Sequence, residues 1–296
     1  MNALRWEVEG RDWPHRESSS FVHSAGLRWH VQRMGDGPVV LLAHGTGSAT
    51  HSWRGLMPLL AQHFTVIAPD LPGHGFTHTP PSGGLSLPGM ANALGALLDT
   101  LGVRPVLAAG HSAGAAIVAR MNLDGRLPVT GLLSLNGAML PLRGVPGVVF
   151  APLARLFAST SLVPRLFAWR AADPIVVERL VRGTGSTLDA EGLALYGRLI
   201  QSPGHAAAAL DMMAHWDVRP LERDLPRLQP RLLQVVGTND LTVPPAEARR
   251  VRELLPEAAI VALAGAGHLA HEERPREVAD LTIRFAAEIG VLPAIA

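Results

Sequence analysis

The feature that most restricts the fold of this chain is the segment 106–119, which reads VLAAGHSAGAAIVA. A short apolar run ends in a Gly-x-Ser-x-Gly motif, and small residues compatible with a helix follow at once. A serine on so sharp a strand-to-helix turn needs backbone angles that side chains resist, and Gly110 and Gly114 let both elements approach closely. The segment predicts a nucleophilic Ser112 at a helix N-terminus, whose free N–H groups favour negative charge. A turn that serves packing alone is the alternative.

The composition restricts the class of protein further. The chain has 296 residues, of which 48% are hydrophobic, and this suffices for one large α/β domain with or without an insertion. Its net charge of +1 provides no field that would attract nucleic acid. It contains no cysteine, which excludes disulfides, thiolate catalysis and cysteine-based metal sites.

Neither a signal peptide nor a membrane-spanning segment is expected. Residues 1–24 carry many charges and no apolar stretch of the kind a signal peptide contains. No run reaches the roughly 18 apolar residues that a spanning helix needs. We therefore expect a cytoplasmic protein whose contact with membranes is at most peripheral.

Apolar runs and helical patterns alternate along most of the chain. Strands are predicted at 21–34 (a pair around a turn), 38–43, 64–68, 106–109, 131–135, 231–236 and 259–263, and helices at 53–60, 87–101, 115–119, 245–255 and 275–289. This alternation indicates an α/β fold with a mostly parallel sheet covered by helices on both faces. Between residues 139 and 225 only short helical patterns occur. We therefore predict a core in two parts, 1–138 and 226–296, separated by an inserted helical lid at 139–225.

Three residues follow three of the predicted strands in the chain order Ser112, Asp240 and His268. The carboxyl ends of parallel strands share one crevice, and this chain order is typical of an α/β-hydrolase triad. His268 would take the proton of Ser112 as general base, and Asp240 would fix the imidazole tautomer. Each residue alone could be ordinary, the aspartate as a helix cap and the histidine as a buried polar group. Their joint placement favours the triad.

The predicted oxyanion hole uses two backbone N–H groups. One belongs to Ala113, directly after the nucleophile, and the other to Thr46 in the segment 44–47, HGTG, which follows the strand at 38–43. These glycines could instead serve only a tight turn. No metal ion and no cofactor are expected, because no His-Glu-x-x-His pattern occurs.

The predicted lid is rich in arginine and aromatic residues. Residues 139–170 contain four arginines and no carboxylate. An apolar, partly anionic ligand or a weak membrane contact would suit this composition. Helices that pack an apolar face over the sheet, with their arginines in water, are the alternative. The candidate ligand-binding residues are Phe150, Phe157, Phe167, Trp169, Arg155 and Arg170.

The motifs around Thr46, Ser112, Asp240 and His268, together with 70–75, DLPGHG, resemble the α/β-hydrolase superfamily over almost the whole chain. A narrower resemblance is to the magnesium-chelatase accessory proteins of bacteriochlorophyll biosynthesis. It rests on residues 10–17, 26–35, 44–54, 85–90 and 110–116. It implies a role around magnesium insertion into protoporphyrin IX in photosynthesis, with chelatase subunits as candidate partners and a tetrapyrrole as candidate ligand.

Three functions remain open at this point. The first is a serine hydrolase, esterase-like, that acts on a bulky apolar substrate such as a tetrapyrrole ester. The second is a non-catalytic accessory protein that binds porphyrin or docks on the chelatase. The third is a generic hydrolase of small esters. The complete triad favours an enzyme, since a protein that only binds has no need of a nucleophile, a base and an acid together.

Overall fold

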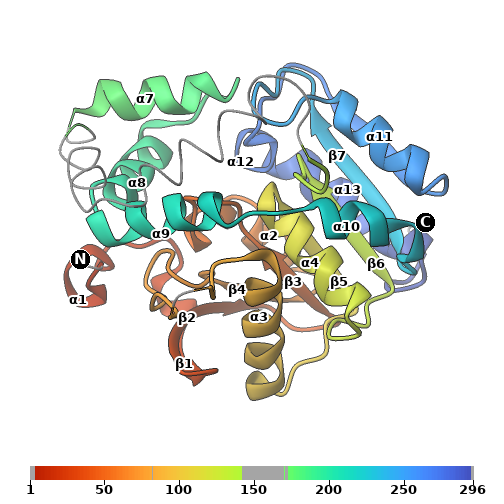
Figure 1. Ribbon diagram of the computed structural model, residues 1–296, viewed down its shortest axis with the longest axis horizontal. Helices are drawn as coiled ribbons and strands as arrows, with labels where there is room; N and C mark the ends of the chain where they lie inside the picture. The colour runs from red at the N-terminus through yellow and green to blue at the C-terminus, as the bar shows by residue number, and fades with distance from the viewer. Residues whose placement is uncertain (1–3, 82, 142–169, 171–172, 295–296) are drawn as a thin grey trace.

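An eight-stranded sheet forms the centre of the protein (Figure 1). The structure is a computed structural model that describes residues 4–81, 83–141, 170 and 173–294. The strands are β1 Ser19–Ser24, β2 Leu27–Met34, β3 Val39–Ala43, β4 Thr65–Pro69, β5 Leu107–His111, β6 Gly131–Leu135, β7 Arg231–Gly237 and β8 Ala259–Leu263. Their order is β1-β2-β4-β3-β5-β6-β7-β8; the six strands β3 to β8 run parallel, and β2 is antiparallel to both of its neighbours, β1 and β4. The predicted α/β fold with its mostly parallel sheet is confirmed.

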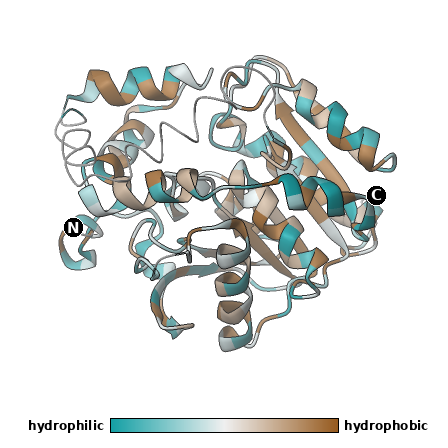
Figure 2. Cartoon of the chain, viewed as in Figure 1, coloured by the Kyte–Doolittle hydropathy of each residue, from teal (hydrophilic) through white to brown (hydrophobic). Residues whose placement is uncertain are grey.

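Burial on both faces explains why the central strands read as continuous apolar runs. Every residue of β4, β5 and β6 is buried. Successive side chains of a strand point to opposite faces. In β5, Ala108 therefore lies in one hydrophobic core, whereas Leu107 and Ala109 lie in the other. Figure 2 shows hydrophobic residues along the central strands, in contrast to the mainly hydrophilic α11 on the outside.

Helices cover the sheet on both faces. The α-helices are α1 Trp6–Glu9, α2 Met57–Leu60, α3 Leu87–Leu101, α4 Ala113–Leu123, α7 Pro174–Gly183, α8 Ala190–Ile200, α9 Pro203–Ala214, α10 Arg219–Asp224, α11 Ala246–Leu254, α12 Ala270–Glu273 and α13 Pro275–Glu288. α3 and α4 pack against each other and share one core. α2 and α13 contribute to the core on the opposite face.

The helix predicted at 53–60 is wrong in form. The chain makes a short 3₁₀ helix at Thr50–Trp53 and then the one-turn helix α2. Pro58 lies in the first turn of α2, where its missing N–H costs nothing, so the regular helix begins next to it. Gly55, between the two pieces, lies so close to Pro275 that an added Cβ would be 3.1 Å from its ring.

The segment predicted as an insertion contains α7, α8, α9 and α10, and no strand occurs in its described residues, 139–141, 170 and 173–225. α8 contacts α7, α9 and the 3₁₀ helix at Thr50–Trp53, whereas α10 packs on α4. The division into 1–138, 139–225 and 226–296 stays a prediction. Within the described residues, no helix has both the length and the apolar character required to cross a membrane.

Candidate active site

Ser112 lies on a strained turn between β5 and α4. Its φ of 52° and ψ of −118° fall in the left-handed half of backbone space, which is costly for a residue with a Cβ. An added Cβ would lie 2.3 Å from Ala115 N if placed on Gly110, and 2.0 Å from Ala43 O if placed on Gly114. Only glycine fits at these two positions. The turn therefore has the sharp form that the motif predicts.

Backbone hydrogen bonds hold this turn in place. The N–H of Ser112 donates to Leu135 O at 3.1 Å, and the carbonyl of Ser112 accepts the N–H of Ala138 at 2.9 Å. Both partners belong to the end of β6 and the loop after it. The strained serine is thus fixed by its neighbouring strand, and its half-buried side chain is presented at the carboxyl end of β5, where α4 begins.

Asp240 and His268 meet at the same edge of the sheet. His268 Nδ1 lies 2.8 Å from Asp240 Oδ2, and both residues are buried. Asp240 Oδ1 accepts the backbone N–H groups of Thr242 and Val243 at 2.7 and 2.8 Å. The side-chain amide of Asn136 donates to Oδ2 at 2.8 Å. The carboxylate of Asp240 therefore lies within hydrogen-bond distance of four nitrogen atoms.

Asn136 is a part of this arrangement that the sequence prediction missed. It follows β6 directly, with φ 47°, and its amide also lies 3.3 Å from the carbonyl of Gly267, the residue before His268. A polar residue directly after a buried strand was the available signal. Asp240 and His268 lie in the loops that follow β7 and β8.

The loop of His268 lies against the turn of Ser112. His111, the last residue of β5, donates from Nε2 to the backbone carbonyl of His268 at 3.0 Å. The centroids of the two imidazole rings are 4.8 Å apart. Burial lowers the pKa of His111 well below its usual value, so its ring is neutral. An added Cβ on Gly45 would lie 3.0 Å from the Cβ of Ser112. The loops after β3, β5 and β8 therefore converge here.

The two predicted oxyanion donors lie on either side of this junction. Ala113 is buried at the first position of α4. Thr46 follows Gly45 in the loop after β3, and its hydroxyl lies 3.4 Å from Met212 Sδ on α9. This contact involves the side chain of Thr46 and not its backbone N–H. Their role as donors to an oxyanion stays a prediction.

A buried network beside the site was also missed. The hydroxyl of Tyr196 on α8 donates to Glu272 at 2.7 Å and lies 3.3 Å from the hydroxyl of Ser48. Glu272 also pairs with Arg54, which reaches Asp189 at 2.9 Å. Complete burial of its side chain raises the pKa of Glu272 to about 7, against the opposing effect of Arg54 and Tyr196. The network joins α8 to α12, the helix that follows His268.

The predicted ligand-binding residues of the lid are not placed at the site. Phe150, Phe157, Phe167, Trp169 and Arg155 lie outside the described residues. Arg170 is described and exposed. Within the described residues, no group of three or more His, Asp or Glu side chains is arranged to hold a metal ion.

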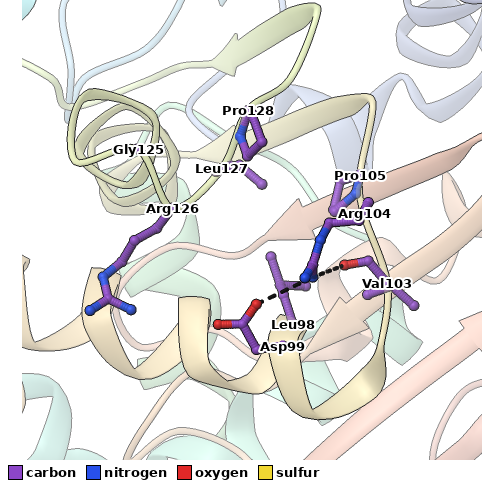
Figure 3. A pocket seen from close by; sticks show the side chains of 9 residues that line it. All are labelled: Leu98, Asp99, Val103, Arg104, Pro105, Gly125, Arg126, Leu127 and Pro128. Carbon is purple, nitrogen blue, oxygen red and sulfur yellow. Dashed lines mark hydrogen bonds and ion pairs between the residues drawn. The ribbon is translucent and has the colours of Figure 1, made fainter.

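A surface hollow lies at the amino ends of β5 and β6, opposite to the end of β5 that carries Ser112 (Figure 3). Pro105 and Pro128 line it, and they precede β5 and β6, whereas Ser112 follows β5. Its Arg104 forms an ion pair with Asp99 at 3.2 Å, and Arg126 extends away from this pair. No predicted site residue lines this hollow. Its arginines do not converge on a common ligand position.

Comparison with known proteins identifies the class to which this site belongs. The α/β hydrolase fold profile matches residues 38–275, and the chain belongs to this family. One relative is the Magnesium-chelatase 30 kDa subunit of Rhodobacter capsulatus. It is 37% identical over 263 residues, which cover 88% of this chain and 92% of that protein. Both resemblances predicted from the sequence are confirmed.

Solved structures show the same fold. The epoxide hydrolase CorEH superposes with a TM-score of 0.78 at 23% identity, over 92% of this chain and 99% of that chain. An α/β hydrolase fold protein from Burkholderia ambifaria superposes with a TM-score of 0.76 at 23% identity, over 89% of this chain and 96% of that chain. At such identities the likeness concerns the fold alone.

Proposed function

We propose that this protein is a serine hydrolase that cleaves esters through Ser112, His268 and Asp240. The observation that carries the proposal is the buried 2.8 Å hydrogen bond between His268 Nδ1 and Asp240 Oδ2. An ionised Asp240 needs a donor at this position, so the proton of the neutral imidazole lies on Nδ1. The lone pair of Nε2 is then free to accept a proton from a nucleophile.

The reaction proceeds in two halves. Ser112 Oγ attacks the ester carbonyl while its proton passes to His268 Nε2, and the negative oxygen is stabilised by backbone N–H groups of Ala113 and Thr46. The C–O bond to the alcohol then breaks, and His268 returns the proton to the leaving oxygen. A water molecule repeats these steps on the acyl-enzyme and releases the acid and free Ser112. Asp240 stabilises the imidazolium that forms in each half.

The relative from Rhodobacter capsulatus supports a narrower version of this proposal. Its name connects it with magnesium chelatase. We extend that connection to this chain, as a role around magnesium insertion in bacteriochlorophyll biosynthesis. The substrate class that follows is an ester of a bulky apolar compound, with tetrapyrrole esters as the first to test.

A fluorophosphonate probe tests the hydrolase directly, because it labels only an activated serine. We expect strong labelling of the wild type and loss of labelling in both Ser112→Ala and His268→Ala. Ser19→Ala is the matched control, because Ser19 Oγ also lies within hydrogen-bond distance of a histidine, 3.0 Å from His30 Nε2. It should label like the wild type. A folded wild type that is not labelled, or labelling lost only in Ser19→Ala, would contradict the proposal.

The second candidate function is a non-catalytic accessory protein, and the name of the 37% identical relative favours it. In that case the folded wild type is not labelled, yet it binds protoporphyrin IX or magnesium-chelatase subunits. The third candidate, a generic hydrolase of small esters, predicts full labelling and turnover of p-nitrophenyl acetate without turnover of tetrapyrrole methyl esters. The three outcomes differ, so one set of assays separates them.

A further inference from the structure

Residues 184–187 form the first part of the connection between α7 and α8, and this part is called the 184–187 connection. It lies between the two loops that carry Asp240 and His268. The carbonyl of Thr184 accepts the N–H of Leu241 at 3.1 Å and the N–H of His268 at 3.3 Å. One backbone oxygen therefore bonds to the residue after Asp240 and to His268 itself. These two loops are held together by a residue of the segment between β6 and β7.

Ser186 adds a third bond from the 184–187 connection. Its hydroxyl accepts the N–H of Leu269 at 2.8 Å, and its exposed fraction is only 1%. Leu269 is the residue after His268, so both of these consecutive N–H groups depend on the connection. Without it they would be buried donors with no partner, which proteins avoid.

Gly185 allows the close approach. Its φ of 83° is in the left-handed region, and an added Cβ would lie 1.8 Å from the carbonyl oxygen of Asn239, the residue before Asp240. A Cβ added to Gly267, before His268, would lie 2.3 Å from the backbone of Gly185. Backbone thus packs directly on backbone on both sides of the connection.

A carboxylate holds the arrangement from the other side. Glu273 on α12 accepts the N–H of Gly267 at 2.9 Å through one oxygen and the N–H of Thr187 at 3.3 Å through the other. The His268 loop is therefore bonded on both sides of the histidine. β8, which precedes this loop, is an edge strand with exposed and half-buried residues, so the sheet alone holds the loop from one side only.

We propose that the 184–187 connection is a positioning element for the Asp240–His268 pair, with Ser186 as its principal positioning residue. It sets the separation of the two loops, and through them the alignment of His268 Nδ1 with Asp240. Because α7 and α8 flank it, displacement of these helices changes the position of His268 through a few residues of backbone. This inference rests on the proposed hydrolase function.

Ser186→Ala tests the inference, because it removes one acceptor and leaves the buried Leu269 N–H without it. We expect the maximal rate constant of fluorophosphonate labelling to fall at least tenfold, while the concentration for half-maximal labelling changes less than twofold. The matched control is Ser86→Ala, which also removes a hydroxyl that accepts a backbone N–H, from Gly89 at 3.3 Å, but at the start of α3. It should label at the wild-type rate. Ser186→Thr, which keeps the acceptor, should restore part of the rate.

A second measurement separates this inference from the proposed function. The downfield NMR signal of the hydrogen-bonded His268 Nδ1–H, assigned by its loss in His268→Ala, should shift or broaden in Ser186→Ala and stay unchanged in Ser86→Ala. If the folded wild type is not labelled, the hydrolase proposal fails, and this signal alone decides the inference. An unchanged signal in Ser186→Ala, or a wild-type labelling rate, overturns the inference.

Discussion

Two groups of one serine, one histidine and one aspartate occur among the described residues. The first is the proposed active site, Ser112, His268 and Asp240, and the second is Ser19, His30 and Asp70. They differ in their backbone conformation and in their surroundings. In the second set, His30 Nδ1 lies 2.7 Å from Asp70 Oδ2, and His30 Nε2 lies 3.0 Å from Ser19 Oγ. The corresponding bond between His268 and Asp240 measures 2.8 Å. Hydrogen bonding alone would give the second set the stronger claim to catalysis, because only there, among the described residues, does the serine hydroxyl lie within hydrogen-bond distance of its histidine.

The backbone separates the two sets. Ser19 has φ −88° and ψ 141°, an ordinary extended residue at the start of β1, whereas Ser112 has φ 52° at the start of a helix. The hydroxyl of Ser19 also accepts a hydrogen bond from the amide of Gln32 at 3.2 Å. Ser19 therefore has no helix N-terminus beside it to stabilise an oxyanion, and its oxygen has two protein partners.

The surroundings of the second set indicate that its role is structural. Trp6, Phe21 and Phe76 pack around the His30 ring at 4.8, 5.3 and 5.5 Å. Asp70 follows β4 and His30 belongs to β2, so their bond ties the antiparallel strand β2 to the parallel part of the sheet. The comparison teaches that the strained turn of Ser112 and the helix N-terminus beside it, rather than hydrogen bonds alone, distinguish the proposed catalytic set.

The largest expected difference between the sets is in reactivity. Asp240→Asn should lower the rate of fluorophosphonate labelling about 10³- to 10⁴-fold, because the amide favours the wrong tautomer of His268. The fold should tolerate the change, since both backbone N–H groups bond to Oδ1, which an asparagine amide keeps. Asp70→Asn should label within tenfold of the wild type at a temperature where it is folded. Equal losses in both variants would contradict the assignment.

The next effect is on stability. Here Asp70→Asn should cost more unfolding free energy than Asp240→Asn. Asp70 Oδ1 accepts the N–H of Thr50 at 2.7 Å, and Oδ2 accepts the N–H of Phe76 at 2.9 Å. Either orientation of an asparagine amide at this position directs its NH₂ group at a backbone donor. Loss of this fully buried charge should lower the free energy of unfolding by about 3–5 kcal/mol.

Urea unfolding of the wild type, Asp70→Asn and Asp240→Asn measures this difference. Asp240→Asn should lose only about 1 kcal/mol, the usual size of one altered hydrogen bond. A larger loss in Asp240→Asn than in Asp70→Asn would show that the assignment of the two sets to chemistry and to the fold is wrong.

Local patterns explain how much of the fold could be predicted. The predicted bounds of β6, β8 and α3 agree with the structure. Their apolar residues have a clear period, and α3 ends at Gly102 in the left-handed conformation. The helix at 53–60 was wrong because Pro58, in its interior, has no N–H to donate to the preceding turn. The regular helix α2 therefore begins only at Met57.

The candidate site divides in the same way. Ser112, Asp240 and His268 could be proposed because each follows a predicted strand, and the parallel topology brings such positions together. The 184–187 connection could not, since its bonds to the two loops come mainly from a backbone carbonyl, which any residue supplies. Glu272 was likewise missed, because its partners Tyr196 and Arg54 come from distant segments.

The smallest expected effect compares two buried carboxyls, Asp70 in the second set and Glu272 beside the proposed active site. Burial raises the pKa of both, but hydrogen bonds and the charge of His30 outweigh it at Asp70, where the net pKa is lowered. At Glu272 burial prevails and the pKa is about 7, above its ordinary 4.5. The folded state therefore binds this proton more tightly than the unfolded state does. The stabilisation is complete below pH 4.5 and is lost as the pH rises through 7.

Glu272→Gln removes this proton linkage while it keeps the shape of the side chain. Relative to the variant, the wild type should lose about 2.5 kcal/mol of unfolding free energy between pH 5 and pH 8, somewhat less than the full shift because the unfolded glutamate is already mostly ionised at pH 5. Urea unfolding at both pH values measures it, with the exposed Glu257→Gln as the matched control that should show no such difference. A wild type that gains stability relative to Glu272→Gln at pH 8 would mean that the ion pair with Arg54 outweighs burial. Glu272 would then resemble Asp70, and the contrast between the two regions would be confined to their serines.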